Sequence, residues 1–233
     1  MHSLSIVIPV FNESENIVKL LDEIYFHLNN KYNYEVIIVD DGSNDNTIEV
    51  LENYKKIIEL KASKHNVNQG QSYALRTGII ESKNDVIITL DGDGQNNPKD
   101  IEIITEKFFA SPKYKLIGGI RKKRKDSFVK IVSSRLANFF RMMVLKDNCK
   151  DTGCSLKIFD KNIFLEFPFF DGIHRFLPAM VNGYGYKTFF VDVDHRPRLY
   201  GKTKYGTFRR LIKGILDIIK VSKIVKEYKN KNV

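Results

Sequence analysis

The stretch 86–98, VIITLDGDGQNNP, decides the fold and holds the most informative polar residues of the chain. It begins as a continuous apolar run, which is typical of a strand buried on both faces of a parallel sheet. It ends in Asp91 and Asp93, and residues two apart in an extended strand point the same way, so both carboxylates can face one hard cation. Gly92 and Gly94 lack a Cβ, which would let a bulky ligand approach the backbone. Taken alone, the motif fits an ordinary strand-to-helix turn equally well.

The composition is that of a folded, basic protein. The 233 residues fit one domain, or one domain with a C-terminal extension, and 42% of them are hydrophobic, enough for a substantial core. Cys149 and Cys154 are too few for a disulfide framework and fit no standard zinc spacing, which favours a reduced, cytoplasmic protein. We expect no signal peptide and no membrane span, because no window has ~18 uncharged apolar residues. The net charge of +10 predicts an anionic partner: nucleic acid, an acidic membrane surface or a phosphorylated ligand.

Apolar runs alternate with helical patterns along the chain. We expect strands over 4–10, 35–39, 57–61, 86–90, 115–120, 156–159 (an edge strand) and 187–193, and helices over about 14–28, 44–54, 70–80 and 100–109. This alternation predicts a mostly parallel α/β sheet with right-handed crossovers and a ligand site at the carboxyl ends of its strands. Polar pairs stand at four such ends: Asn12/Glu13, Asp40/Asp41, Asn68/Gln69 and Asp91/Asp93. Their convergence favours a ligand site over a plain turn at Asp91.

A helical pattern over 127–144 places an arginine on an apolar face. Arg135 shares this face with a stripe of apolar residues: Phe128, Ile131, Val132, Phe139 and Met143. An unpaired guanidinium is costly there, so Arg135 should meet an anion. A buried ion pair with a protein carboxylate explains the position equally well.

The last stretch of the chain, from residue 208 onward, predicts an amphipathic helix whose polar face is mostly basic. Such a helix either packs on the domain or lies on an anionic bilayer, where apolar insertion and lipid charge stabilise it. We therefore divide the chain into a domain over 1–205 and a helix with its tail over 206–233. Within the domain we expect a nucleotide-binding half over about 1–98 and an acceptor half over about 99–205.

Two aspartates and several downstream cations describe a site for a diphosphate. The cations are Arg135, Arg198, Lys202 and Lys204. A Mg²⁺ or Mn²⁺ ion held by Asp93, with or without Asp91, would bridge phosphate oxygens and neutralise a departing diphosphate. Asp40 or Asp41 could accept hydrogen bonds from a ribose or a base. This combination fits a nucleotide-sugar, and neither a dinucleotide-binding G-x-G-x-x-G nor a P-loop motif occurs.

Four segments, in this order and spacing, resemble the family 2 inverting glycosyltransferases with the GT-A fold. They are IVIPVFNESENI (6–17), VIIVDDGSNDNT (36–47), NQGQSYALRTGI (68–79) and ITLDGDGQNNP (88–98). Later segments resemble the dolichyl/polyprenyl-phosphate mannosyltransferase branch: Arg121, SRLAN (134–138), DTGC (151–154) and RLYGKTK (198–204). The resemblance covers essentially the whole chain and implies a GT-A, Rossmann-like sheet flanked by helices.

The resemblance also implies roles for matching residues. The nucleotide and donor would be held by Pro9, Phe11, Glu13, Asp40, Asp41, Asp91, Gly92, Gln95 and Arg121. The metal would lie among Asp91, Asp93 and Gln95. The acceptor phosphate would meet Arg135, Arg198, Lys202 and Lys204, and the catalytic set would be Asp93, Arg135 and Arg198.

The chain departs from the family pattern in two places. Asp-Gly-Asp-Gly-Gln stands where Asp-Ala-Asp and a leucine before the glutamine are usual, and 172–176 replaces a commonly acidic residue. Both departures leave the donor sugar open. The chain has no tryptophan, whereas processive polysaccharide synthases of this family carry a Gln/Arg-x-x-Arg-Trp motif.

The sequence therefore predicts a metal-dependent inverting transferase that moves a sugar from a GDP- or UDP-linked donor to a polyprenyl phosphate. A lipid phosphate is already anionic, so this acceptor needs cations around it rather than a general base. We expect the protein to be peripheral on the cytoplasmic face of the membrane, with a membrane-protein partner or a homo-oligomer as further possibilities.

Other functions fit parts of the sequence. Transfer to a hydroxyl of a lipopolysaccharide or cell-wall precursor would use Asp171 as base, although Asp171 before a glycine is typical of a turn. We expect His174 and His195 to be packed or hydrogen-bonded rather than catalytic. A basic nucleic-acid-binding protein is disfavoured because no recognised nucleic-acid module is present, and nothing specifically favours a non-catalytic nucleotide-sugar sensor.

Overall fold

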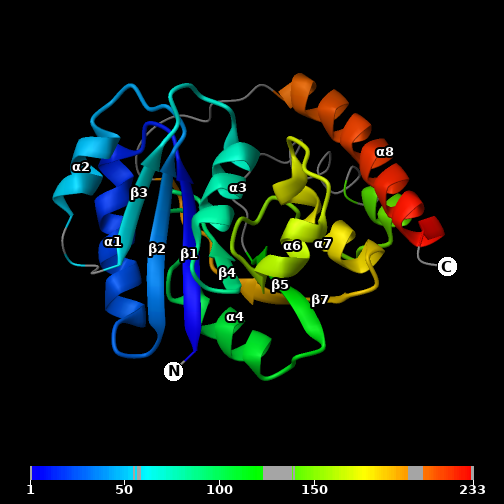
Figure 1. The fold of residues 1–233 in the computed structure, drawn as a ribbon, viewed down its shortest axis with the longest axis horizontal. Coiled ribbons are helices and arrows are strands. Elements are labelled where there is room, and N and C mark those ends of the chain that lie inside the picture. The colour runs from blue at the N-terminus through cyan, green and yellow to red at the C-terminus, as the bar shows by residue number, and fades with distance from the viewer. Residues whose placement is uncertain are drawn as a thin grey trace.

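One seven-stranded sheet organises the molecule, with helices on both of its faces (Figure 1). The computed structural model describes residues 2–54, 56, 59–122, 138, 140–198 and 207–231, with α8 side chains from residue 213 onward. The strand order is β3-β2-β1-β4-β6-β5-β7. The strands are β1 (Ser3–Val10), β2 (Asn33–Asp40), β3 (Leu60–Lys64), β4 (Val86–Thr89), β5 (Tyr114–Arg121), β6 (Lys157–Asp160) and β7 (Lys187–Val193).

The first half of the sheet is parallel, as predicted. Strands β3, β2, β1 and β4 all run the same way, so their carboxyl ends meet at one edge of the sheet, at the top of Figure 1. The intervening helices are α1 (Ser14–Leu28), α2 (Thr47–Asn53), α3 (Gln71–Glu81) and α4 (Asp100–Phe109). This half confirms the predicted α/β fold class.

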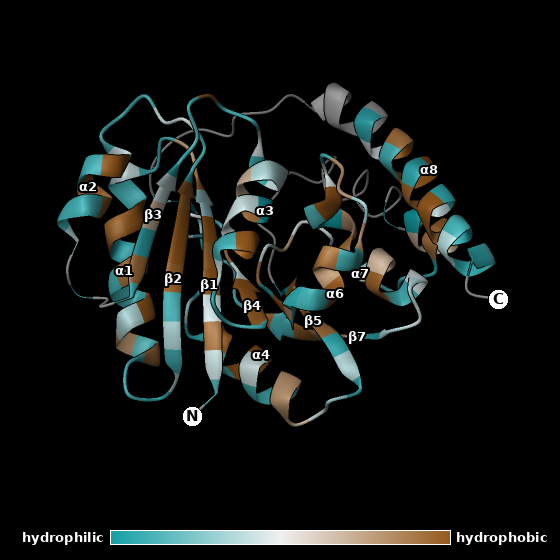
Figure 2. Cartoon of the chain, in the orientation of Figure 1, coloured by the Kyte–Doolittle hydropathy of each residue, from teal (hydrophilic) through white to brown (hydrophobic). Residues whose placement is uncertain are grey.

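The alternation of side chains along β1 explains how both faces of the sheet are covered. Ile6 and Ile8 belong to a core shared with α1 and α4, whereas Val7 belongs to a second core shared with α3 and α7. Successive strand residues point to opposite faces, so a continuous apolar run is buried on both sides. Figure 2 shows the resulting hydrophobic colour along the middle of β1 and β2.

Two strand predictions are wrong in detail. The strand expected over 57–61 begins only at Leu60 and ends at Lys64. The strand expected at an edge, β6, instead lies between β4 and β5 and is antiparallel to both. Its first three residues are buried, which agrees with an interior position; the pairing with β4 involves residues about 70 apart and leaves no local signal in the sequence.

The C-terminal part adds α6 (Lys161–Glu166), α7 (Ile173–Gly183) and α8 (Thr207–Lys231). The amphipathic helix predicted from residue 208 is therefore present. It packs on α7: Val221 is fully buried, and a Cβ at Gly183 would lie 2.3 Å from Val225 Cγ2. None of the helices in the described ranges is long and apolar enough to cross a membrane.

The helix predicted over 127–144 lies mostly outside the described residues. Asn138 and residues 140–145 are helical. Met143, which we expected on an apolar stripe, is 58% exposed. The position of Arg135 falls outside the described part of the chain.

Candidate active site

The polar strand ends come together at the carboxyl edge of the parallel strands. The end of β1 is joined to the end of β2 because the backbone N–H of Asn12 donates to Ser43 Oγ at 2.8 Å and that of Glu13 donates to Thr47 Oγ1 at 3.1 Å. The loop before α3 then joins the ends of β2 and β4. The edge therefore carries one connected group of side chains.

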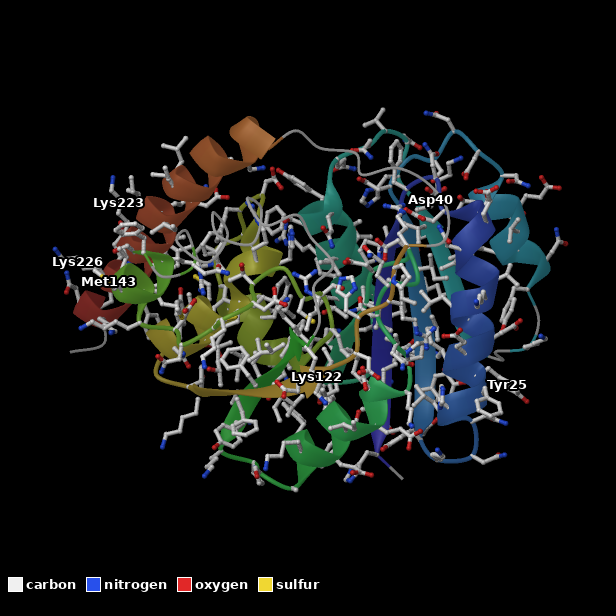
Figure 3. All side chains as sticks on the ribbon, turned by 180° about the vertical axis from the view of Figure 1, so that it is seen from behind. Tyr25, Asp40, Lys122, Met143, Lys223 and Lys226 are labelled. Atoms are coloured by element: carbon white, nitrogen blue, oxygen red, sulfur yellow. The ribbon has the colours of Figure 1, made fainter. Side chains whose placement is uncertain are left out.

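At the end of β2, the carboxylate of Asp41 is fully engaged by protein donors. Its oxygens accept hydrogen bonds from the backbone N–H groups of Gln69 at 3.0 Å and Gly70 at 2.7 Å, and His65 Nδ1 lies 2.8 Å away. Asp40, beside it, is labelled in Figure 3. Asp40 Oδ1 accepts from the Ser43 N–H at 2.9 Å, while its buried Oδ2 meets no hydrogen-bond partner within the described ranges.

At the end of β4, the carboxylates of Asp91 and Asp93 have fewer partners. Asp91 Oδ1 accepts from Gln71 Nε2 at 2.7 Å, and Asp93 Oδ1 accepts from the Gln95 N–H at 3.1 Å. Burial raises the pKa of Asp91, against the opposing influence of Ser155 and Lys157. Burial, followed by the charge of Asp91, raises the pKa of Asp93 to about 6. Two partly desolvated carboxylates that repel each other are a place where a cation would be stabilised.

Arg198 brings a cation to these carboxylates. Its guanidinium pairs with Glu13, and Nη1 lies 3.8 Å from Asp93 Oδ2. The preceding segment is fastened to the Asp93 turn, because the Arg196 N–H donates to the Gln95 carbonyl at 2.9 Å and Gln95 Nε2 donates to the Arg196 carbonyl at 3.2 Å. Three residues predicted for the site, Glu13, Asp93 and Arg198, are therefore neighbours.

Arg121, at the end of β5, is held in place by the segment that begins at Asp151. Its Nε and Nη2 donate to the two Asp151 oxygens, both at 2.7 Å, and Nη1 lies 3.2 Å from His195 Nε2. Gly153 makes this pairing possible, since a Cβ there would lie 2.7 Å from Arg121 Nη2. The predicted donor-binding arginine thus has a fixed orientation.

The glycines of the DGDG stretch have different roles. A Cβ at Gly92 would lie 2.5 Å from Val10 Cγ1, so Gly92 lets the turn pack against β1. We expected it to admit a ligand instead. Gly94 has a φ of +71° and nothing within 4 Å of its virtual Cβ, so the open approach is at Gly94. Pro9 and Phe11, also predicted for the site, are half-buried on β1 and just after it.

The first turn of α3 holds residues that the sequence reasoning did not identify. Gln71 contacts Asp91, and Ser72 Oγ accepts from the Gly172 N–H at 2.8 Å and lies 2.7 Å from His174 Nδ1. Burial, and then the charges of Arg175 and Lys157, lower the pKa of His174 to about 3. The imidazole is therefore neutral at neutral pH, and one of its two nitrogens is free of a proton. The only local signal was a polar helix start directly after the Asn68/Gln69 pair.

A small cavity lies behind this turn. Its volume is about 20 Å³, room for about one water, and its polar lining comes from Gln71, Thr89, Asp91, Ser155, Lys157 and His174. Lys157 is buried and donates to the Cys154 carbonyl. His174 is thus packed and hydrogen-bonded, as expected.

The remaining predicted residues are only partly placed. Lys202 and Lys204, like Arg135, lie outside the described residues. Asp171, the alternative base, pairs with Lys213 of α8, and its Oδ1 is 3.9 Å from the virtual Cβ of Gly70. It therefore stands beside the start of α3, near the site.

Asp91 and Asp93 could hold a metal ion only if a bound substrate completed its coordination shell. Within the described ranges, no three His, Cys, Asp or Glu side chains gather closely enough to hold an ion by themselves. Mg²⁺ is commonly held by one or two carboxylates, with substrate phosphates and water completing its shell. The raised pKa of Asp93 is consistent with such a partly built site.

Comparisons with known proteins concern the family and the fold of the chain. A model for "Glycosyl transferase family 2" matches residues 5–167. The chain is similar to an undecaprenyl-phosphate 4-deoxy-4-formamido-L-arabinose transferase of Aeromonas hydrophila, at 31% identity over 219 residues, covering 93% of this chain and 66% of the relative. It is also similar to a dodecaprenyl-phosphate galacturonate synthase of Rhizobium johnstonii, at 33% identity over 224 residues, covering 94% and 66%. The chain thus spans slightly less than two thirds of these relatives.

Solved structures share the fold. Glucosyl-3-phosphoglycerate synthase from Mycobacterium tuberculosis, in complex with UDP, superposes with a TM-score of 0.73 at 13% identity, covering 96% of this chain and 81% of the other. The same enzyme with Mn²⁺, UDP and phosphoglyceric acid gives 0.72 at 14% identity, covering 93% and 78%. At this identity the likeness establishes the fold.

Proposed function

This chain belongs to glycosyl transferase family 2, and we propose that it moves a sugar from a nucleotide-sugar to a polyprenyl phosphate with inversion at the anomeric carbon. The observation that carries the proposal is the Asp91–Asp93 turn with Arg198 beside it, at the carboxyl edge of the sheet. The names of the polyprenyl-phosphate-dependent relatives support the acceptor class.

The donor would lie along this edge with its diphosphate at Asp93. Asp93, with Asp91 and Gln95 around it, would hold Mg²⁺ or Mn²⁺, which would neutralise charge on the departing nucleoside diphosphate. Structural neighbours crystallised with Mn²⁺ or Mg²⁺ and UDP support this assignment. Since Asp41 is already engaged by three donors, Asp40 Oδ2 is the better candidate to accept a hydrogen bond from the nucleoside.

The acceptor phosphate would be drawn in by cations. Arg198 pairs with Glu13 and approaches Asp93, so an incoming phosphate would meet a positioned guanidinium; Arg135, Lys202 and Lys204 remain predicted contributors. A phosphate nucleophile is ionised at neutral pH and needs no base. Asp171 is paired with Lys213, an arrangement less suited to a general base. We expect the enzyme to act peripherally at the cytoplasmic face of a membrane.

The experiment is an assay of lipid products. Purified full-length protein, Mn²⁺ and undecaprenyl phosphate in detergent are incubated with each of a panel of radiolabelled UDP- and GDP-sugars. We expect one donor to give an organic-soluble product that mild acid cleaves and that disappears when EDTA is added. An acid-stable glycoside formed on a hydroxyl acceptor would reject the phosphate acceptor, and full activity in EDTA would reject the metal.

A further inference from the structure

Two helical segments near the C-terminal side expose large apolar side chains. On α8, Ile215, Leu216 and Ile219 are 50% to 60% exposed. On the segment 140–145, Met143 and Val144 are 58% and 53% exposed. Single exposed apolar residues are ordinary, but five large ones on adjoining elements indicate a binding surface.

The two segments lie side by side. Leu145, at the end of the shorter segment, belongs to the same core as Ile224 and Val225 of α8. Figure 3 labels Met143, Lys223 and Lys226 close together at one end of the molecule. Figure 1 shows the short segment directly behind α8. We call the following residues the docking surface: Met143, Val144, Ile215, Leu216 and Ile219, with Lys220, Lys223 and Lys226.

The docking surface is strongly basic. Over residues 213–231, α8 carries six lysines against Asp217 and Glu227, which gives a net charge of +4. Asp217 is buried and pairs with Arg175 at 2.7 Å, so it adds little to the outer face. Lys220, Lys223 and Lys226 are exposed beside the apolar residues.

We propose that the docking surface binds an anionic lipid bilayer. Exposed apolar residues bordered by lysines are the composition of helices that lie in a membrane interface, where apolar insertion and attraction to anionic headgroups both contribute. An interface with a second copy of the chain would be expected to be poor in lysine. Charge therefore favours lipid over self-association.

The position of α8 would bring a bound bilayer close to the candidate active site. This part of the proposal rests on the proposed function. In Figure 1, α8 begins at the level of the carboxyl edge of the sheet and runs down the side of the molecule. Lys213 of α8 pairs with Asp171, which stands beside Gly70 at the start of α3. A bilayer lying along α8 would therefore place headgroup phosphates near the mouth of the site.

The test uses vesicles that contain neither prenyl phosphate nor nucleotide. The full chain is co-sedimented with phosphatidylcholine vesicles with and without about one third phosphatidylglycerol, at low and high salt. We expect binding only with phosphatidylglycerol, weakened by salt as the lysine contribution is screened. A Lys220→Gln, Lys223→Gln, Lys226→Gln variant should bind ~100-fold more weakly, at ~1 kcal/mol per lysine. Leu216→Ser with Ile219→Ser should also weaken binding.

Matched controls change the same residue types elsewhere. Lys64→Gln, Lys99→Gln, Lys187→Gln removes three exposed lysines from other surfaces, and Phe26→Ser removes a side chain that is 77% exposed on α1. Both should bind vesicles like the unchanged chain. Thermal unfolding of every variant checks that the fold is retained.

Three outcomes would overturn the proposal. They are equal binding to both vesicle types, unchanged binding of the docking-surface variants, and a dimer in solution that these variants convert to a monomer. The detergent assay described above reports on sugar transfer without a bilayer, so failure of docking and failure of the proposed function give different results.

Discussion

The ends of β2 and β4 carry the same kind of residue at the same edge of the sheet, yet they differ in how their carboxylates are satisfied. Asp41 is 3% exposed and receives two backbone N–H groups and an imidazole nitrogen. Asp93 receives one backbone N–H and has a guanidinium 3.8 Å away. A saturated buried carboxylate stabilises a loop, whereas an undersatisfied one beside a second carboxylate is suited to a cation.

The first turn of α3 connects the two ends. Gln69 and Gly70 donate to Asp41, while Gln71 donates to Asp91. The next residue, Ser72, accepts from Gly172 and contacts His174. Residues 69–72 therefore connect Asp41, Asp91 and the turn before α7 to the first turn of α3.

The strongest test of this contrast is Asp93→Asn. Removing the carboxylate should lower kcat by ~100-fold or more, because an electrostatic contact to the developing charge on the leaving group is lost. The free energy of unfolding without metal should not fall, since the change removes a buried charge that Asp91 repels. Steady-state kinetics at saturating Mn²⁺ and urea unfolding measure the two quantities. Unchanged turnover would remove Asp93 from the site.

The opposite pattern is expected for Asp41→Asn. An asparagine oxygen can replace only part of the charged acceptor, so the loop over 65–70 loses hydrogen bonds and the free energy of unfolding should fall by about 2–3 kcal/mol. Turnover measured well below the melting temperature should fall much less than for Asp93→Asn. If Asp41→Asn left stability unchanged and abolished nucleotide binding, the two strand ends would have exchanged roles.

Local sequence patterns predict where Asp41 and Asp93 lie in the fold. They do not predict which of the two carboxylates is saturated with hydrogen bonds. Apolar runs and helical spacing predict the strands around Val7 and Ile88 and the edge where Asp41 and Asp93 meet, because these patterns repeat within a few residues. Asp41 is saturated and Asp93 is not because two backbone N–H groups, 28 and 29 residues after Asp41 in the chain, donate to the Asp41 carboxylate. No local pattern shows that distant donors will arrive at one aspartate and not at the other.

Contacts between residues far apart in the chain also explain the other features that the sequence did not predict correctly. The interior place of β6 depends on pairing with β4, and the packing role of Gly92 depends on Val10 of another strand. Gln71 looked like an ordinary helix residue because its partner, Asp91, lies 20 residues away. Sequence patterns thus identified the residues with unusual chemistry at the strand ends, while the residues that orient them became visible only in three dimensions.

Gln71→Leu should have effects on turnover and on stability that lie between those of Asp93→Asn and Asp41→Asn. The substitution keeps a side chain of similar size but removes the amide that donates to Asp91 Oδ1 at 2.7 Å. We expect kcat/KM to fall by ~10-fold and Mn²⁺ to bind more weakly, with a loss of about 1 kcal/mol in stability. Isothermal titration with Mn²⁺ and nucleoside diphosphate, together with kinetics, measures this. Gln71→Glu is the matched variant, and it should be worse, because it places a third carboxylate beside Asp91 and Asp93.

The smallest expected effect is a pH dependence of stability that comes from His174, the α7 residue in contact with Ser72. The pKa of His174 is lowered to about 3, against about 6.5 in an unfolded chain. Between these values the unfolded chain binds the proton and the folded chain does not, so stability is fully present above pH 6.5 and declines as pH falls toward 3. We expect His174 to contribute a loss of about 1 kcal/mol between pH 6.5 and 5.5, somewhat below the ~1.4 kcal/mol limit for one titrating group, because the histidine of the unfolded chain is only half protonated at pH 6.5. Asp93, whose pKa is raised to about 6, contributes a gain in the same interval, so the His174 contribution is read from the difference between the unchanged chain and His174→Asn. Urea unfolding of both proteins at both pH values measures this difference, and His174→Asn retains a hydrogen-bond acceptor for Ser72. An unchanged pH dependence in His174→Asn would assign no titration to His174 and leave it as a packing residue.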